Sequence, residues 1–326
     1  MGEPEHRDAL EEALEGAGLA GPTVVRRRPS KHRTSFPLEV LELTLEDGAS
    51  LRLAFKQLGW DDLDPEGRLA KPRFLHDPRR ERAVYASVLP AAPPGPPRFY
   101  GSMVDPQAGR HWLFVEWVEG RELYQVGDRR LWEAAGRWLG EAHLALAEDL
   151  ELHRERGHLL DYDEAYYRRW LERATEFARS GDEPTRRAKA LAWLAGRYGG
   201  VVEALLEMPK TVIHGEFYAS NVLVRGDAAT PRICPVDWEL AATAPGLIDL
   251  AALVSGGWGD GDREAIVAAY RSAVGPAAFS ARQLDLARLH LAVQWLGWAP
   301  PSWVPPEGQR QDWLGEAVAL AEGLGL

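Results

Sequence analysis

Two apolar segments in the second half of the chain are interrupted by polar residues, and this pattern constrains the fold most. The first segment is VIHGEFYASNVLV, residues 212–224, and the second is PVDWELA, residues 235–241. Runs of Val, Ile and Leu predict short buried strands, and a polar side chain among them costs free energy unless it is paired. We therefore expect a functional site at His214, Glu216, Asn221 and Asp237.

The chain changes from strands to helices along its length. After a helix predicted at residues 5–18, the segments TVVRRR, FPLEVLELTL and ASLRLAFKQL predict three antiparallel strands, and the Asp47-Gly48 pair favours a hairpin between the last two. Residues 61–78, rich in Pro and charge, predict a connecting loop, and a helix is predicted to begin after Pro78. The segments RFYGSMVD and HWLFVEWVEG predict a second hairpin. Further helices are predicted at residues 129–150, 163–180, 184–207, 245–256, 261–273, 281–297 and 310–324.

The predicted strands come first and the helices follow, with one short β segment among the helices. This order predicts an α+β chain in two lobes. We expect an N-terminal helix at residues 1–22, a sheet-rich lobe at 23–115, a hinge at 116–120 and a helical lobe at 121–326. Lys56 lies inside the third predicted strand, where it is either an edge lysine that reaches water or a buried functional cation.

The composition excludes several kinds of partner and site. A net charge of -11, from 38 basic and 49 acidic residues, argues against nucleic acid or an anionic membrane as the main partner, and favours a small molecule. The single cysteine, Cys234, excludes an intrachain disulfide and a zinc site built from cysteines. No segment has the pattern of a signal peptide or the apolar length of a membrane span, so we expect a cytoplasmic protein, and the oligomeric state stays open.

The candidate residues match the needs of phosphoryl transfer from ATP. That reaction needs a cation for the phosphates, oxygen ligands for Mg²⁺ and a carboxylate for the attacking hydroxyl. Glu216, Asn221 and Asp237 supply oxygen donors of the kind that Mg²⁺ prefers. Lys56 and Glu81 supply a candidate ion pair in the strand-rich part of the chain.

The segment HGEFYASNVLV followed by VDWELAATAPGLIDLA resembles the HGDxxxxNxL and IDWExAxxGxxxxDLA motifs of the aminoglycoside phosphotransferase and choline kinase superfamily. That superfamily is a branch of the protein-kinase-like fold, and the resemblance extends from about residue 23 to the end of the chain. It implies an N-terminal antiparallel sheet lobe, a larger helical lobe, and Mg-ATP-dependent transfer to a hydroxyl of a small molecule.

The resemblance also implies roles for the matching residues. Glu216 stands where the family has its catalytic Asp, and Asn221 and Asp237 would hold Mg²⁺. Lys56 would reach the α- and β-phosphates and would pair with Glu81. Further implied positions are the hinge residues beside adenine, Glu116, Trp117 and Val118, and two residues that support the catalytic loop, His214 and Asp249.

Two departures from the family pattern leave alternatives open. Glu216 is one methylene longer than Asp, so it is the base with a shifted substrate, a metal ligand, or part of a weak site. The loop RRRPSKHRTSFPL has no glycine to cover the phosphates, although Ser30, Ser35 and the basic residues Arg26–Arg28, Lys31 and Arg33 could meet them. The alternative function is therefore a nucleotide-binding module with little or no activity, and a minor one is a zinc hydrolase using His214 and Glu216.

The acceptor is not determined by these motifs, and GTP in place of ATP also stays open. An aminoglycoside, a macrolide, a choline-like amine, a sugar and a natural product all fit an acidic chain. The tryptophans of the C-terminal helices either hold a cationic or flat acceptor or pack in the core. These residues are Trp258, Trp295, Trp298, Trp303 and Trp313, with Asp161, Asp163, Glu164 and Tyr167 as further acceptor candidates.

Overall fold

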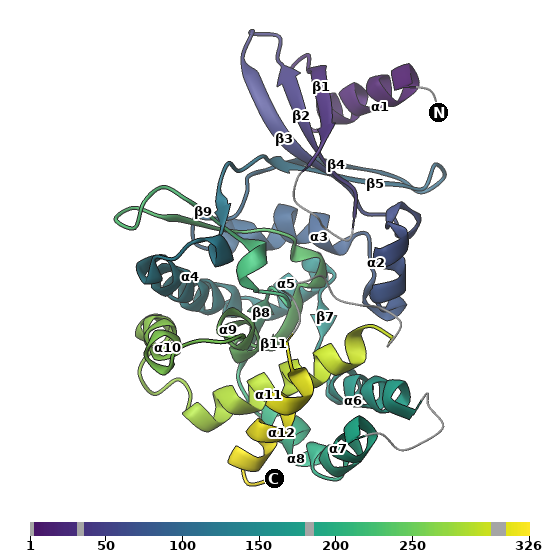
Figure 1. Cartoon of the computed structure of the whole chain (residues 1–326). Coiled ribbons are helices and arrows are strands. Elements are labelled where there is room, and N and C mark those ends of the chain that lie inside the picture. The colour runs from purple at the N-terminus through teal and green to yellow at the C-terminus, as the bar shows by residue number, and fades with distance from the viewer. Residues whose placement is uncertain (1–2, 31–35, 180–185, 301–310) are drawn as a thin grey trace.

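The computed structural model describes residues 3–30, 36–179, 186–300 and 311–326, and these form two lobes (Figure 1). In the described part of the sheet-rich lobe, five antiparallel strands pair in the order β1-β2-β3-β5-β4. The α+β fold class expected from the sequence is therefore confirmed. The strands are β1 (Thr23–Pro29), β2 (Leu38–Thr44), β3 (Ser50–Gln57), β4 (Phe99–Asp105) and β5 (Arg110–Glu116).

The predicted Asp-Gly hairpin joins β2 to β3. Gly48 has a φ of 81°, which glycine adopts without strain, and Asp47 accepts a hydrogen bond of 2.8 Å from the Ala49 amide. Because β3 pairs with β2 on one side and β5 on the other, Lys56 is on a central strand and not on an edge.

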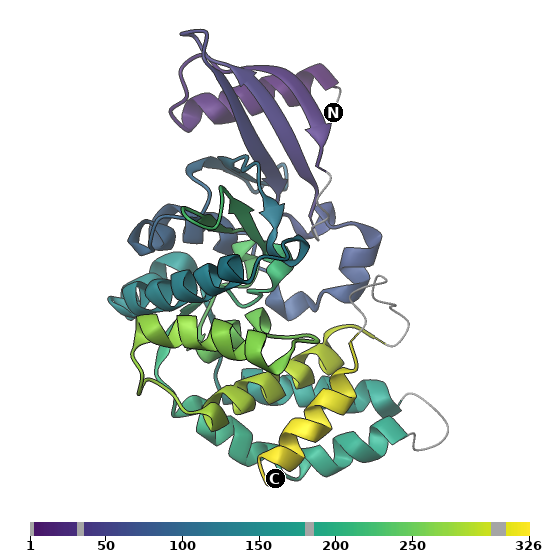
Figure 2. The ribbon, with the colours of Figure 1, turned by 60° about the vertical axis from the view of Figure 1, so that its left-hand side comes forward.

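Helix α1 (Glu3–Gly16) covers one face of this sheet, as Figure 2 shows, and it confirms the helix predicted near the N-terminus. Leu10 and Leu14 are buried against the apolar side chains that alternate along β2, β3 and β5. The other face of the sheet is thereby left to the helical lobe. The strand residues in this small core include Leu41, Leu43, Leu53, Phe55 and Phe114.

The segment between β3 and β4 differs from the prediction of a plain loop. It contains α2 (Pro65–Ala70), because Asp64 caps the helix by accepting a bond from the Gly67 amide and Pro65 suits its first position. The helix expected after Pro78 begins as α3 (Arg80–Ala83) and continues as a π-helical segment, Val84–Val88.

The helical lobe contains most of the predicted helices, with two corrections. The single helix predicted at residues 184–207 is two helices, because the chain turns where the Arg197 amide bonds to the Leu194 carbonyl. The charged segment after residue 149 is a separate helix, since Asp149 has a left-handed backbone with a φ of 53°. The helices are α4 (Arg129–Ala147), α5 (Leu150–Gly157), α6 (Glu164–Arg179), α7 (Arg186–Ala195), α8 (Tyr198–Leu206), α9 (Leu247–Leu253), α10 (Asp260–Val274), α11 (Ala281–Trp298) and α12 (Trp313–Gly323).

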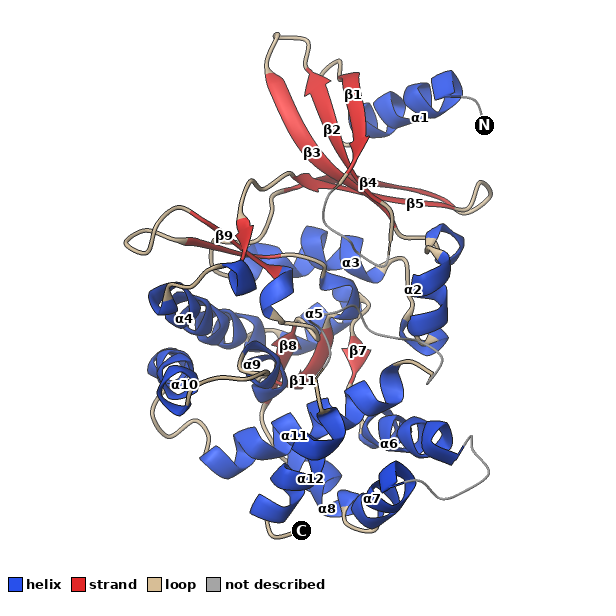
Figure 3. Ribbon diagram, in the orientation of Figure 1, coloured by secondary structure: helices blue, strands red, loops and turns tan. Residues whose placement is uncertain are grey.

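Short strands within the helical lobe hold the polar motifs toward the sheet lobe, as Figure 3 shows. Among the described residues they form two small sheets, ordered β10-β9-β6 and β7-β11-β8. The loops after β8 and β10 carry residues 214–221 and 236–241, so the two motifs emerge side by side. The strands are β6 (Arg121–Glu122), β7 (Leu160–Asp161), β8 (Lys210–Ile213), β9 (Val222–Arg225), β10 (Arg232–Pro235) and β11 (Ala242–Pro245).

Helices α4 and α10 pack closely because α4 presents two glycines to its partner. A Cβ added at Gly136 would lie 2.8 Å from the Ile266 carbonyl oxygen, and one at Gly140 would lie 2.9 Å from that of Tyr270. Since α4 also contacts β8, this packing supports the strand that leads into the first motif. Within the part of the chain that the structure describes, no helix has the length and apolar character needed to cross a bilayer.

We expect Gly140→Ala to destabilise the protein by about 1–3 kcal/mol, because the new methyl group would overlap the α10 backbone. Gly200→Ala on α8 is the matched control, since a Cβ there meets nothing within 4 Å and alanine is the better helix former by up to about 1 kcal/mol. Denaturant unfolding of both variants measures the effect. Equal stability of the two variants would contradict the close packing.

Candidate active site

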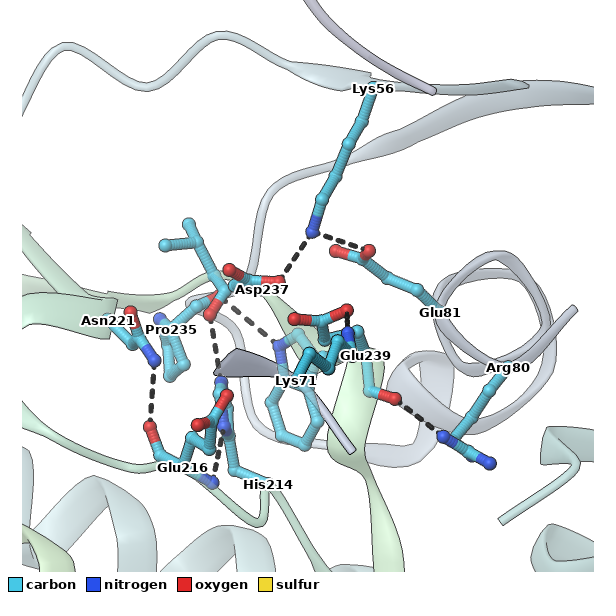
Figure 4. Close-up of polar contacts among 12 residues, drawn as sticks. Lys56, Lys71, Arg80, Glu81, His214, Glu216, Asn221, Pro235, Asp237 and Glu239 are labelled. Atoms are coloured by element: carbon cyan, nitrogen blue, oxygen red, sulfur yellow. Dashed lines mark hydrogen bonds and ion pairs between the residues drawn. The ribbon is translucent and has the colours of Figure 1, made fainter. Parts of the chain in front are cut away.

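The site is organised around one buried lysine. Lys56, 4% exposed on β3, places its Nζ 2.7 Å from Oε2 of Glu81 and 2.5 Å from Oδ1 of Asp237, as Figure 4 shows. Glu81 comes from α3 and is also buried, while Asp237 follows β10 in the helical lobe. The structure thus brings together three predicted residues from distant parts of the chain.

The charges of this triad depend on one another. Burial opposes the charge of Lys56, yet Asp237 and Glu81 hold its pKa above the ordinary lysine value. Burial raises the pKa of Glu81 to about 7, although Lys56 opposes the change. Burial also opposes ionisation of Asp237, but Lys56 outweighs it and the pKa of Asp237 is lowered. The lysine and Asp237 are therefore a charged pair at neutral pH.

The loop after β8 is held in place by hydrogen bonds to a carboxylate on α9. Asp249 on α9 accepts bonds from the backbone amides of His214, at 2.6 Å, and Gly215, at 2.9 Å. Gly215 has a φ of 85°, and a Cβ there would lie 2.4 Å from the Leu240 carbonyl oxygen. Glycine is therefore the residue that this turn accommodates without strain or a clash.

The His214 ring is engaged on both sides. Its Nε2 donates to the Val236 carbonyl at 2.9 Å, and its Nδ1 accepts from the Glu216 amide at 3.3 Å. Burial lowers the pKa of His214, so the ring is neutral. Both nitrogens are used by the backbone, which leaves neither for the zinc ion of the hydrolase alternative.

Asn221 and Asp237 present oxygen atoms to the same cleft. Asn221 donates from Nδ2 to the Glu216 carbonyl at 3.0 Å, so its Oδ1 is left as the acceptor. Asp237 adopts a left-handed backbone, with φ 68° and ψ 59°, which a non-glycine residue rarely adopts and which is often found at functional sites. Magnesium is commonly held by one or two protein oxygens together with phosphate oxygens. The donor set therefore fits Mg²⁺.

Glu216 is half-buried, and the charges of Glu239, Asp237, Lys71 and Lys56 act on its carboxyl group. Burial raises the pKa of Glu216 to about 8, with further contributions from Glu239 and Asp237 and opposition from Lys71 and Lys56. Its carboxyl group therefore holds a proton at neutral pH in the protein alone.

The predicted hinge residues differ in how they are used. The Glu116 carboxylate accepts hydrogen bonds from both terminal nitrogens of Arg232, each at 2.7 Å. The carboxylate is therefore turned toward β10. The Trp117 amide donates to the Arg52 carbonyl at 3.3 Å, and Val118 packs on Leu223. The Glu116 carboxylate and the Trp117 amide are therefore engaged within the protein, and Val118 lines the cavity between the lobes.

A cavity of about 100 Å³ lies between the lobes beside these residues. A larger hollow of about 510 Å³ adjoins it, shares Trp117 and Val118, and is lined by Arg28, Arg121 and Arg225. The chemistry places the site in the smaller cavity, because the ion triad and the oxygen donors line it. Its lining includes Ala54, Lys56, Glu81, Val115, Glu116, Trp117, Val118, Asn221, Leu223, Val236 and Asp237.

The sequence matches the model of a phosphotransferase enzyme family, APH, over residues 64–290. The chain belongs to this family. No curated protein matches the sequence. The fold is shared with solved members of the family, as the structural comparisons show.

Three solved structures illustrate this likeness. A GDP and kanamycin complex of an aminoglycoside 2″-phosphotransferase is 14% identical, with a TM-score of 0.56, and 93% of this chain covers 94% of that one. A macrolide 2′-phosphotransferase from Brachybacterium faecium is 17% identical, with a TM-score of 0.57 and coverage of 96% and 97%. An aminoglycoside phosphotransferase from Streptomyces rimosus, bound to ADP and streptomycin, is 18% identical, with a TM-score of 0.53 and coverage of 90% and 98%.

Several charged residues of this candidate site were not predicted from the sequence. Lys71, at the end of α2, forms a buried ion pair with Glu239, two residues after Asp237. Arg80 binds the carbonyl oxygens of Leu75 and Glu239, each at 2.8 Å. Glu239 is part of the quoted WE motif and could have been singled out, whereas nothing local marks Lys71 or Arg80.

The cluster therefore contains one more acidic than basic side chain. Four carboxyl groups face two ammonium groups and the Arg80 guanidinium, and in the protein alone the proton on Glu216 balances the extra acid. An added divalent cation fits such a site electrostatically. The four carboxylates are Glu81, Glu216, Asp237 and Glu239.

The candidate acceptor residues are only partly brought to the site. Trp295 donates to the Tyr218 hydroxyl at 2.6 Å and stacks on Trp313, so these rings adjoin the catalytic loop. Trp258 instead packs edge-on against Trp132, away from that loop. Trp303, Ser35, Lys31 and Arg33 lie outside the described residues.

The acidic candidates serve the fold instead. Asp161 is paired with Arg154 and Lys210, Asp163 accepts a bond of 2.7 Å from the Tyr166 amide, and Glu164 pairs with Arg168. Tyr167 is buried.

We expect Glu216→Gln to stabilise the metal-free protein, and increasingly so as the pH rises. Because the folded pKa of about 8 exceeds the ordinary value of 4.5, the wild type loses stability as the pH rises through about 8. The gain over the wild type should grow from near zero at about pH 4.5 to about 1–3 kcal/mol above about pH 8. Melting temperatures measured across this range test it, with the exposed Glu203→Gln as control. A gain independent of pH would contradict it.

Proposed function

We propose that this protein transfers the γ-phosphoryl group of Mg-ATP to a hydroxyl of a small molecule. The observation that carries the proposal is the ion triad of Lys56, Glu81 and Asp237, which lines the cleft between the lobes together with Asn221. Glu216 adjoins this group, since its carbonyl accepts a hydrogen bond from Asn221. Family membership supports phosphotransfer as the class of reaction.

The nucleotide would lie in the interlobe cavity. Ala54, Val115 and Leu223 supply apolar surface for the base, and the backbone of residues 116–118 would lie along its edge. Lys56 would then meet the α- and β-phosphates. Structural neighbours hold GDP or ADP, so GTP is a second nucleotide to test.

Asn221 and Asp237 would hold Mg²⁺ through Oδ1 of the amide and the carboxylate. When bound, the ion would neutralise phosphate charge during transfer. Asp249 would keep the loop after β8 in place by accepting a bond from the His214 amide, and the His214 ring would tie that loop to the Val236 carbonyl in the loop after β10.

Glu216 would take the proton of the acceptor hydroxyl. The acceptor oxygen forms a bond to the γ-phosphorus while the bond from that phosphorus to the bridging oxygen of ADP breaks. The products are the phosphorylated acceptor and ADP, and the proton rests on Glu216. The acceptor class stays to be found, and neighbours bound to kanamycin and streptomycin suggest hydroxylated amines as a first panel.

A second candidate is a nucleotide-binding module with little or no transfer. It is favoured by Glu216 in the position of the family Asp and by the raised pKa of its carboxyl group. Thermal shift with Mg-ATP and Mg-GTP, beside ADP or GDP release over a panel of hydroxylated acceptors, separates the two. Stabilisation by nucleotide without any acceptor-stimulated release would favour the second candidate.

We expect Asp237→Ala to lower turnover by about 10³-fold or more while the protein stays folded, because one metal ligand and the partner of Lys56 are lost. The exposed Asp61→Ala is the control and should keep wild-type turnover. Initial rates and melting curves measure both effects. Full activity of Asp237→Ala would contradict the proposed role of Asp237 in phosphoryl transfer.

We also expect kcat to depend on Glu216 through its protonation. Since the base must be ionised, kcat should rise with pH toward a plateau, and Glu216→Gln should lose about 10²–10⁴-fold and the pH dependence together. The pH profile of initial rates at saturating nucleotide measures this. A variant that keeps the wild-type rise would show that another group is the base.

A further inference from the structure

A second buried lysine lies beside the first. Lys71 is 5% exposed, and its ammonium group bonds to the Glu239 carboxylate. It is held in place by α2, since its own amide closes the helix by donating to the Gly67 carbonyl at 2.8 Å. Lys71 therefore extends from the end of a short helix of the sheet lobe and contacts a carboxylate of the helical lobe.

The two ammonium groups share one aromatic ring. Lys56 Nζ lies 5.5 Å and Lys71 Nζ 4.7 Å from the centre of the Phe36 ring, so the two nitrogens are at most about 10 Å apart. Figure 4 shows Lys56 beside Glu81 and Asp237, and Lys71 beside Glu239; the charge of Lys71 also acts on Glu216 and Asp237. Lys56 therefore serves the metal-binding end of the site, and Lys71 the end where the acceptor would be deprotonated.

The electrostatics agree with this placement. Lys71 opposes the raised pKa of Glu216 more strongly than Lys56 does, whereas Lys56 dominates at Asp237. A γ-phosphoryl group in transfer must lie between the metal ligands and the base. That position is closer to Lys71 than the α- and β-phosphates would be.

The catalytic loop itself provides no cation. Residues 214–221, HGEFYASN, contain no Lys or Arg. An ammonium group has three N–H donors, and within the described residues Glu239 is the hydrogen-bond acceptor found for Lys71. Lys71 can therefore keep Glu239 and still donate to a ligand oxygen.

We propose that Lys71 is a catalytic residue that donates a hydrogen bond to an oxygen of the γ-phosphoryl group as it passes to the acceptor. The proposal rests on the phosphotransferase function proposed above. No bond is made or broken at Lys71, which keeps its proton throughout and offsets negative charge on the moving group. Glu239 positions the ammonium group.

A contact to the γ-phosphate predicts a difference between nucleotides. Thermal-shift titration compares Mg-ADP with the Mg complex of the non-hydrolysable triphosphate analogue adenylyl imidodiphosphate. Lys71→Met should weaken binding of the triphosphate analogue by about 10- to 100-fold and leave ADP binding within about twofold, as expected for one charge-assisted hydrogen bond. Lys56→Met should weaken both. If guanine nucleotides stabilise the wild type more than adenine nucleotides do, the comparison is made between Mg-GDP and the Mg complex of the corresponding non-hydrolysable GTP analogue.

Three further variants distinguish a specific loss of the triphosphate contact from misfolding of the protein. Lys71→Arg should retain most of the preference for the triphosphate. The double variant Lys71→Met with Glu239→Gln leaves no charge buried alone and should lose that preference as Lys71→Met does. Lys210→Met removes an ion pair to Asp161 elsewhere in the helical lobe and should change neither affinity.

The outcomes separate the two proposals. If the wild type binds both nucleotides and Lys71→Met weakens them equally or not at all, Lys71 only ties the lobes together and the inference is overturned. If no nucleotide stabilises the wild type, the proposed function fails, and the inference fails with it. Loss of triphosphate preference in both Lys71→Met variants supports it.

Discussion

The contact of Lys56 with Glu81 and Asp237 is the interaction on which the rest of the site depends. Each of these charges is largely withdrawn from water, and a buried charge is tolerated only when it is paired. The three residues come from β3, α3 and the loop after β10. Pairing them therefore holds the two lobes in a fixed relation and creates the cleft that the oxygen donors face.

The charge balance of this cluster explains its chemistry. Burial raises the pKa of Glu216 and that of Glu81, and the neighbouring carboxylates add to the effect, while Asp237 stays ionised because Lys56 contacts it directly. A site of this kind can bind a divalent cation, and its carboxyl groups can hold or release a proton near neutral pH. Both are components of phosphoryl transfer to a hydroxyl.

Much of the fold and part of the site could be predicted because their signals are local. Asp47-Gly48 marks a tight turn, and the spacing of Glu216, Asn221 and Asp237 lies within one short stretch. The break between α7 and α8 was missed, since the helical stripe continues across it. The position of Glu116 in a hinge beside adenine stays a prediction, and only the tertiary structure pairs its carboxylate with Arg232, far away in sequence.

The sequence by itself determined the order of strands and helices, the motif that carries the oxygen donors, and the resemblance to phosphotransferases. Only the tertiary structure decided that Lys56 is central and buried, that Lys71 and Arg80 join the site, and that Asp161 does not. The physical reason is that backbone preference and hydrophobic period act between neighbours in the chain. The pairing of a buried charge is instead decided by whichever partners packing brings within reach.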